Sequence, residues 1–217
     1  LRHAVFQALG KLGSVSAVPA LLREIASASS TPDCVREASL ALSLLTANPE
    51  AKEYLQNAAP PLLDRYRAAA TDQPGLRAAL LSAMAGVADP SFAAEFVQAV
   101  ESEDKGVLQA GLRGLRAVGD ATKLPRCRAL VAHADPRVRR AAIEAAGQLG
   151  REDADVEALL SRLNPAVESN DSAREAAWRG FRQLVGKRAI PDRIRAAERL
   201  TATRYIPIHI FDQYHPR

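Results

Sequence analysis

The chain has 217 residues, of which 47 % are hydrophobic and 25 % charged, with a formal net charge of +4 at pH 7. This composition is ordinary for a globular protein and excludes disorder over most of the chain. No run of about 18 uncharged apolar residues and no signal-peptide pattern occurs, so we expect no membrane span. Alanine and leucine dominate the hydrophobic share and only 5 % of residues are aromatic, which favours helices over sheets.

A helical pattern recurs along the chain in six copies that can be aligned on one alanine. The intervals between these alanines are 34, 41, 31, 31 and 35 residues, by subtraction of their positions. A large apolar residue stands two positions after each alanine, and we expect it to fill the space between repeats. The alanines are Ala4, Ala38, Ala79, Ala110, Ala141 and Ala176, and the large residues are Phe6, Leu40, Leu81, Leu112, Ile143 and Trp178.

A second helix is predicted after each first one, because proline recurs where that helix would begin. Proline suits a first helical turn, where its missing N–H has no intrahelical acceptor. These prolines are Pro19, Pro60, Pro125 and Pro191. Three glycines should end helices with positive φ, namely Gly13, Gly119 and Gly150. Three aspartates should cap the first helix that follows them, namely Asp33, Asp135 and Asp171. The stretch 47–58 is an insertion, expected as a longer loop or an extra helical turn.

The stretches "DPRVRRAAIEAAGQLG" (135–150) and "SAVPALLREI" (16–25) carry a register that resembles HEAT repeats, especially the short bacterial type related to phycobilisome lyase repeats. The resemblance implies an all-α fold, an α-solenoid of helix pairs. We expect about six repeats over residues 1–200, with the first one truncated, and an extended tail over 201–217. Because Leu1 falls inside a repeat, we expect the chain to be a fragment of a longer protein.

Basic and acidic residues are distributed in blocks. Residues 105–140 carry nine Lys/Arg against two Asp/Glu, 141–170 two against six, and 171–217 ten against five. This alternation argues against one unbroken positive track for nucleic acid, and we interpret most arginines as solvated or cap-satisfying. Arg126, Arg195 and Arg199 fall on predicted second helices, which in HEAT arrays line the concave surface where partners dock. They are the candidate partner-binding arginines.

The tail alternates isoleucines with proline and aromatic residues, which opposes a helix. It is predicted to cap the last repeat or, alternatively, to dock on a partner through Tyr205, Phe211 and Tyr214. His209, Asp212 and His215 resemble a zinc ligand set only loosely, and solvent-exposed or structurally bonded histidines are favoured. Cys34 and Cys127 have no neighbouring cysteine and are interpreted as core thiols. Trp178 is interpreted as a packing residue rather than a base-stacking one.

No catalytic motif is present: no "HE" dipeptide, GxSxG, Walker A or GxGxxG pattern occurs. The leading hypothesis is a non-catalytic scaffold that binds a protein or peptide and needs no cofactor or metal. The alternatives are a nucleic-acid-binding HEAT domain, related in fold to HEAT-like DNA glycosylases, and a chromophore lyase-related module. The compartment and the oligomeric state are not predicted, beyond an expectation of a soluble, cytoplasmic domain.

Overall fold

The computed structural model describes residues 2–188, 192–193, 195–196 and 199, and the side chains of these residues from Ala4 onward. These residues form eleven α-helices and three 3-10 helices, and no strand occurs among them. The prediction of an all-α fold built from helix pairs is therefore confirmed. The chain divides into two compact units, Leu1–Asp120 and Ala121–Arg217, which are described separately.

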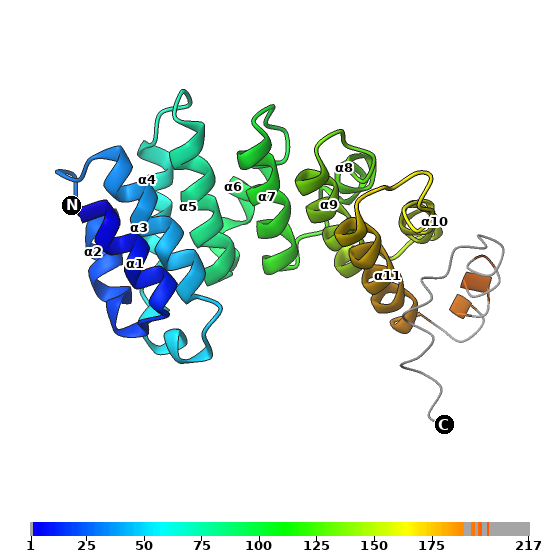
Figure 1. Ribbon diagram of the computed structural model, residues 1–217, viewed down its shortest axis with the longest axis horizontal. Helices are drawn as coiled ribbons and strands as arrows, with labels where there is room; N and C mark the ends of the chain where they lie inside the picture. The colour runs from blue at the N-terminus through cyan, green and yellow to red at the C-terminus, as the bar shows by residue number, and fades with distance from the viewer. Residues whose placement is uncertain (1, 189–191, 194, 197–198, 200–217) are drawn as a thin grey trace. The chain divides into compact units, whose positions relative to one another are not determined.

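The first unit contains two layers of helices (Figure 1). The first helices α1, α3, α5 and α7 pack side by side in one layer, and the second helices α2, α4 and α6 each pack on the first helix that follows them in the chain. The elements in order are α1 (Arg2–Leu12), η1 (Val15–Ala17), α2 (Val18–Ala26), α3 (Pro32–Leu45), η2 (Pro49–Leu55), α4 (Ala59–Ala68), α5 (Pro74–Val87), η3 (Pro90–Phe92), α6 (Ala93–Ala99) and α7 (Lys105–Val118).

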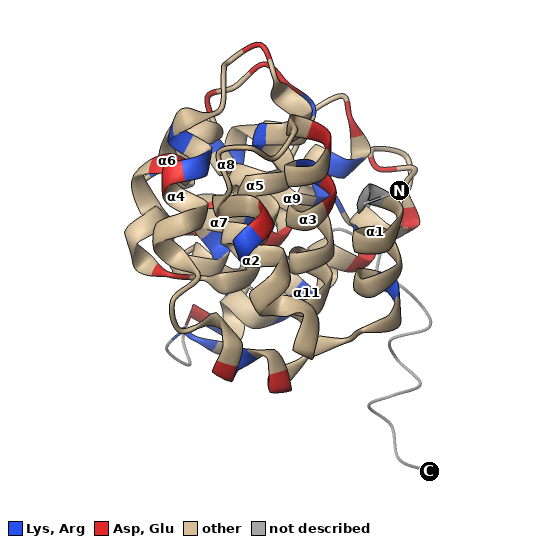
Figure 2. Cartoon of the chain, turned by 90° about the vertical axis from the view of Figure 1, so that its left-hand side faces the viewer, with Lys and Arg blue, Asp and Glu red and all other residues tan. Residues whose placement is uncertain are grey.

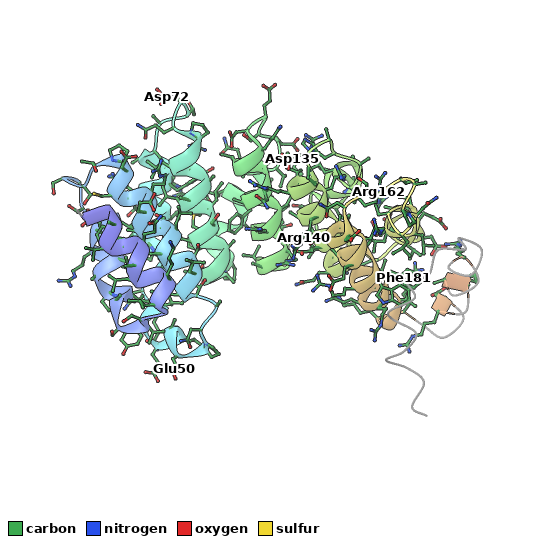
Figure 3. All side chains as sticks on the ribbon, viewed as in Figure 1. Glu50, Asp72, Asp135, Arg140, Arg162 and Phe181 are labelled. Carbon is green, nitrogen blue, oxygen red and sulfur yellow. The ribbon has the colours of Figure 1, made fainter. Side chains whose placement is uncertain are left out.

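The second unit repeats this arrangement with α8 (Leu124–Leu130), α9 (Pro136–Leu149), α10 (Asp153–Ser161) and α11 (Asp171–Gly186). The first helices α9 and α11 pack closely because glycines meet at their crossing. A Cβ atom on Gly147 would overlap the backbone of Gly180. Any larger residue at position 147 would therefore force the two helices apart. Figure 3 shows Phe181 extending from α11 beside this crossing.

Proline begins the second helices as predicted. Pro19, Pro60 and Pro125 occupy the first turn of α2, α4 and α8, whereas Pro191 lies outside the described residues. The predicted insertion is confirmed as η2, a 3-10 segment inside residues 47–58. It projects Glu50 at the end of the first unit opposite to Asp72, which lies in the loop between α4 and α5 (Figure 3).

The large residues two positions after the aligned alanines are buried in three of the six copies. Leu81, Leu112 and Ile143 have no exposed side-chain surface, while Phe6 and Trp178 are half-buried. The prediction is wrong for Leu40, which is 39 % exposed. In α3, Ala41 packs directly against Gly10 of α1, and Ala41 and Leu45 are buried while Leu40 is not.

Two of the three predicted aspartate caps are wrong by one or two residues. Asp135 caps α9 and accepts a hydrogen bond from the Arg137 amide at 2.9 Å. Helices α3 and α11 are capped instead by Thr31 and Asn170, and Asp33 and Asp171 lie in their first turns. Asp33 and Asp171 interact favourably with the positive end of the helix dipole but do not cap the helix. The side chains of Thr31 and Asn170 accept the amide hydrogen bonds instead.

Gly13 and Gly119 have positive φ values, as predicted. Gly150 does not: its φ is −60° and its backbone is extended. Its small size is needed for space, because a Cβ atom there would overlap the Ala146 carbonyl oxygen and the Asp155 side chain. The tail from Thr201 and most of the helix expected near Pro191 lie outside the described residues, so the boundary at residue 200 and the count of six repeats stay predictions.

Candidate partner-binding surface

Helix α8 presents Arg126 on its exposed side. Leu124, Cys127 and Leu130 recur at helical spacing and are buried, which turns the positions between them outward. Burial raises the pKa of the Cys127 thiol to about 11, so the thiol stays protonated and unreactive at neutral pH. Cys127 is thus a core thiol as predicted, whereas Cys34 is half-buried.

An ion-pair network joins α8 to α10 beside Arg126. The Arg128 guanidinium donates to Asp155 Oδ1 at 2.8 Å and to Glu152 Oε2 at 2.9 Å. Asp155 is fully buried and also accepts from the amides of Arg151 and Glu152, which completes a capping box at the start of α10. Burial acts to lower the pKa of Arg128, but its hydrogen bonds and the two carboxylate charges outweigh this and raise it.

Arg195 and Arg199 lie beside carboxylates of the same unit. Arg199 Nη2 is 3.1 Å from Asp153 Oδ2 and its Nη1 is 3.3 Å from Glu157 Oε1. Arg195 forms an ion pair with Asp192. Asp153 also accepts from Arg188 at 2.6 Å, and this hydrogen bond is the main cause of the lowered pKa of Asp153. Two of the three candidate arginines therefore have their charge balanced within the chain.

The structure brings Arg195 and Arg199 together on the segment that faces α10, and places Arg126 separately on exposed α8. The candidate aromatic residues Tyr205, Phe211 and Tyr214 lie outside the described residues, as do His209, Asp212 and His215. Within the described part, no group of three His, Cys, Asp or Glu residues is placed to hold a metal ion. No helix of that part is long and apolar enough to cross a membrane.

Trp178 packs within its own helix. Its ring stacks on that of Phe181, with centroids 5.9 Å apart and the planes 19° from parallel. The indole Nε1 is buried and has no hydrogen-bond partner among the described residues. A half-buried ring held in this way agrees with the interpretation as a packing residue.

Sequence reasoning missed three buried acidic residues, each held by an arginine about 28 residues away in sequence. They are Glu95 with Arg67, Asp155 with Arg128 and Glu168 with Arg139. Figure 2 shows basic and acidic segments on α4 and α6, the helices that carry Arg67 and Glu95. One signal was available for Arg139: arginine stands two positions before five of the six aligned alanines, as Arg2, Arg36, Arg77, Arg139 and Arg174.

Three of these arginines hold the loop before their own first helix. Arg139 donates to the carbonyls of His133 and Ala134, Arg77 to that of Ala69 and Arg174 to that of Glu168. Arg77 also stacks 4.4 Å over the Tyr66 ring and donates to the Tyr66 hydroxyl at 2.7 Å. Arg77 and Tyr66 line an open cleft of about 330 Å³ together with Gln98, Glu101, Ser102, Asp104 and others.

Stacked helical hairpins with two layers define the class of this protein as an α-solenoid. Residues 93–182 match the family model of HEAT repeats, so this part of the chain is similar to HEAT repeats. The crystal structure of an engineered protein is similar in fold, with a TM-score of 0.63 and 17 % sequence identity over 85 % of this chain and 90 % of that one. A search of curated proteins found no match. HEAT repeats are generally protein-interaction scaffolds and typically lack catalytic activity.

Proposed function

We propose that this chain is a non-catalytic scaffold that binds a protein or peptide partner through the exposed side of its second helices in the second unit, where Arg126 lies, and through the tail. The observation that carries the proposal is the HEAT-repeat match, which covers α8 and α10 entirely. Rigid stacked helices with exposed polar side chains suit a complementary protein surface.

The charge arrangement supports a protein partner over nucleic acid. A phosphate-binding track needs positive charges in succession. On this face, Asp153 and Glu157 of α10 alternate with Arg188 and Arg199, and Arg195 is balanced by Asp192. The acidic side chains of such a surface repel a polyanion such as nucleic acid. A protein partner that carries both positive and negative charges fits it better.

A copurification experiment tests the proposal with Arg126→Glu, since reversing Arg195 or Arg199 would set like charges beside Asp192 or Asp153 and disturb folding. Arg137→Glu is the matched control, because Arg137 is an exposed arginine on the first helix α9. We expect a protein retained by the wild type to be lost with Arg126→Glu and kept with Arg137→Glu. Truncation after Leu200 tests the contribution of the tail in the same assay.

Two outcomes would contradict the proposal. Retention that survives both Arg126→Glu and the truncation would show that the proposed surface is wrong. Retention of duplex DNA by the wild type, falling steeply with salt and lost in Arg126→Glu, would replace the protein partner by nucleic acid.

A further inference from the structure

The open cleft lined by Arg77 and Tyr66 lies between two neighbouring loops of the first unit. These loops are residues 69–73, between α4 and α5, and residues 100–104, between α6 and α7. Figure 3 shows Asp72 projecting from the first of them. The volume of about 330 Å³ is near the lower limit of ligand pockets, which is about 300 Å³. The cleft therefore has room for one long side chain and not for a helix.

The two loops give the mouth of the cleft a negative charge. They contain no lysine or arginine and four acidic residues, which are Asp72, Glu101, Glu103 and Asp104. All four are exposed, and Glu101 and Asp104 line the cleft. With Arg77 of the lining and Lys105, which directly follows Asp104, acidic side chains still outnumber basic ones by four to two. Such a surface attracts a cation and repels a phosphate group.

Arg77 is held on one side of the cleft by the protein itself. Its guanidinium donates to the Ala69 carbonyl at 3.1 Å and to the Tyr66 hydroxyl at 2.7 Å, and it stacks over the Tyr66 ring. Burial raises the pKa of Tyr66, so this side chain adds no charge at neutral pH. The positive charge is thus fixed beside the loop 69–73, whereas the lining carboxylates belong to the loop 100–104.

Several polar groups of the lining have hydrogen-bonding capacity that the described residues do not use. Asp104 Oδ1 caps α7 by accepting from the Val107 amide at 2.9 Å, and Asp104 Oδ2 accepts no hydrogen bond from the residues described. The exposed side chains of Thr71 and Gln98 likewise make none with that part of the chain. Pro74 and Val107 add apolar surface. An alkyl chain that ends in a cation matches this combination of apolar and acidic groups.

We propose that this cleft binds a lysine or arginine side chain on an extended segment of a protein partner. The cationic group pairs with Asp104 and Glu101, while the alkyl stem lies on the apolar part of the lining. The exposed amide of Gln98 hydrogen-bonds the backbone of the segment. The site lies in the first unit, so the proposal does not depend on the surface around Arg126.

An NMR titration of the isotope-labelled full chain with a short peptide tests this site. The probe carries one arginine among glycine and serine residues. The matched peptide carries norleucine instead, which keeps an alkyl stem without the charge. We expect the arginine peptide to shift the amide signals of residues 100–104 saturably and to bind at least about tenfold more tightly than the norleucine peptide.

Three variants locate the binding site. Asp104→Asn removes the charge but keeps the cap of α7, because asparagine caps helices as well as aspartate does, and we expect it to weaken the arginine peptide at least about fivefold. Glu50→Gln is the charge-matched control and should leave binding unchanged, because Glu50 is exposed at the end of the unit opposite to Asp72 (Figure 3). Gln98→Arg places a cation of the chain itself in the cleft and should abolish binding.

Three results would overturn the proposal. The first is equal affinity of the arginine and norleucine peptides, or of the wild type and Asp104→Asn for the arginine peptide. The second is tighter binding of a glutamate peptide, which would show that Arg77 receives an anion. The third is binding of ethylguanidinium as tight as that of the arginine peptide, because the site would then take a small free cation rather than a segment of a protein.

Discussion

Replacing Glu168 by glutamine removes the charge from the most completely buried ion pair of the second unit. The Glu168 side chain has no exposed surface, and the Arg139 guanidinium meets it with two hydrogen bonds of 2.7 Å each. Glu168 also accepts from the Asn170 amide at 3.0 Å. The variant keeps the shape of the side chain but replaces one of its two acceptor oxygens by an NH2 group. This donor then faces the N–H donors of Arg139 or the Asn170 amide.

The expected loss in the free energy of unfolding depends on the Arg139 charge that remains buried. Breaking a buried pair by removing one partner costs about 3–5 kcal/mol, because the other charge remains desolvated. Arg139 retains its hydrogen bonds to the carbonyls of His133 and Ala134, so we expect a value near the lower end, about 3 kcal/mol. For a chain of this size that corresponds to a fall in melting temperature of roughly 6–12 °C.

Urea and thermal melts followed by circular dichroism measure this loss, and Glu144→Gln provides a neighbouring control. Glu144 pairs with Arg140 at 3.0 Å in an i,i+4 geometry on the outer side of α9. Exposed helix pairs of this kind contribute about 0.3–0.5 kcal/mol. If Glu168→Gln and Glu144→Gln destabilise the protein equally, the buried Arg139–Glu168 pair does not stabilise the loop before α9.

The difference in stability between the wild type and Glu168→Gln depends on pH. Burial acts to raise the pKa of Glu168, but the hydrogen bonds from Arg139 and the Asn170 amide, with the Arg139 charge, outweigh it and lower the pKa. A lowered folded-state pKa means that the stabilisation is complete above the unfolded value, about 4.3, and is lost as pH falls through the folded value. The difference between wild type and Glu168→Gln should therefore be constant from about pH 6 to 8 and shrink below about pH 4.

The remaining predictions concern the core. Ile143→Ala should lower the free energy of unfolding by about 2–5 kcal/mol, whereas Leu40→Ala, at the same repeat position but exposed, should cost less than about 1 kcal/mol; equal losses in denaturant melts would contradict this difference in burial. Cys127 should resist a thiol reagent at pH 8 in the folded protein while Cys34 reacts, and mass spectrometry of the labelled chain would detect the opposite order.

The helical repeat could be read from the sequence because its signals are local. The alanine register and the prolines of α2, α4 and α8 act within one or two turns, so helix type and pairing follow from spacing alone. Helix caps were less certain, since two polar residues one or two positions apart competed at the starts of α3 and α11. Thr31 and Asn170 accept the amide hydrogen bonds because the backbone places them, and not Asp33 or Asp171, just before the first helical residue.

Pairs distant in sequence were decided by the tertiary structure alone. Glu168 lies 29 residues from Arg139, and Asp153 lies 46 residues from Arg199, so no local pattern links them. The same holds for Leu40, which is exposed although its repeat position is buried in three other copies. The sequence by itself determined an α-solenoid of helix pairs, because helix formation and amphipathic spacing are short-range properties. Which side chains are buried, paired or left exposed depended on the rotation of each helix against its neighbours, which only close packing between repeats sets.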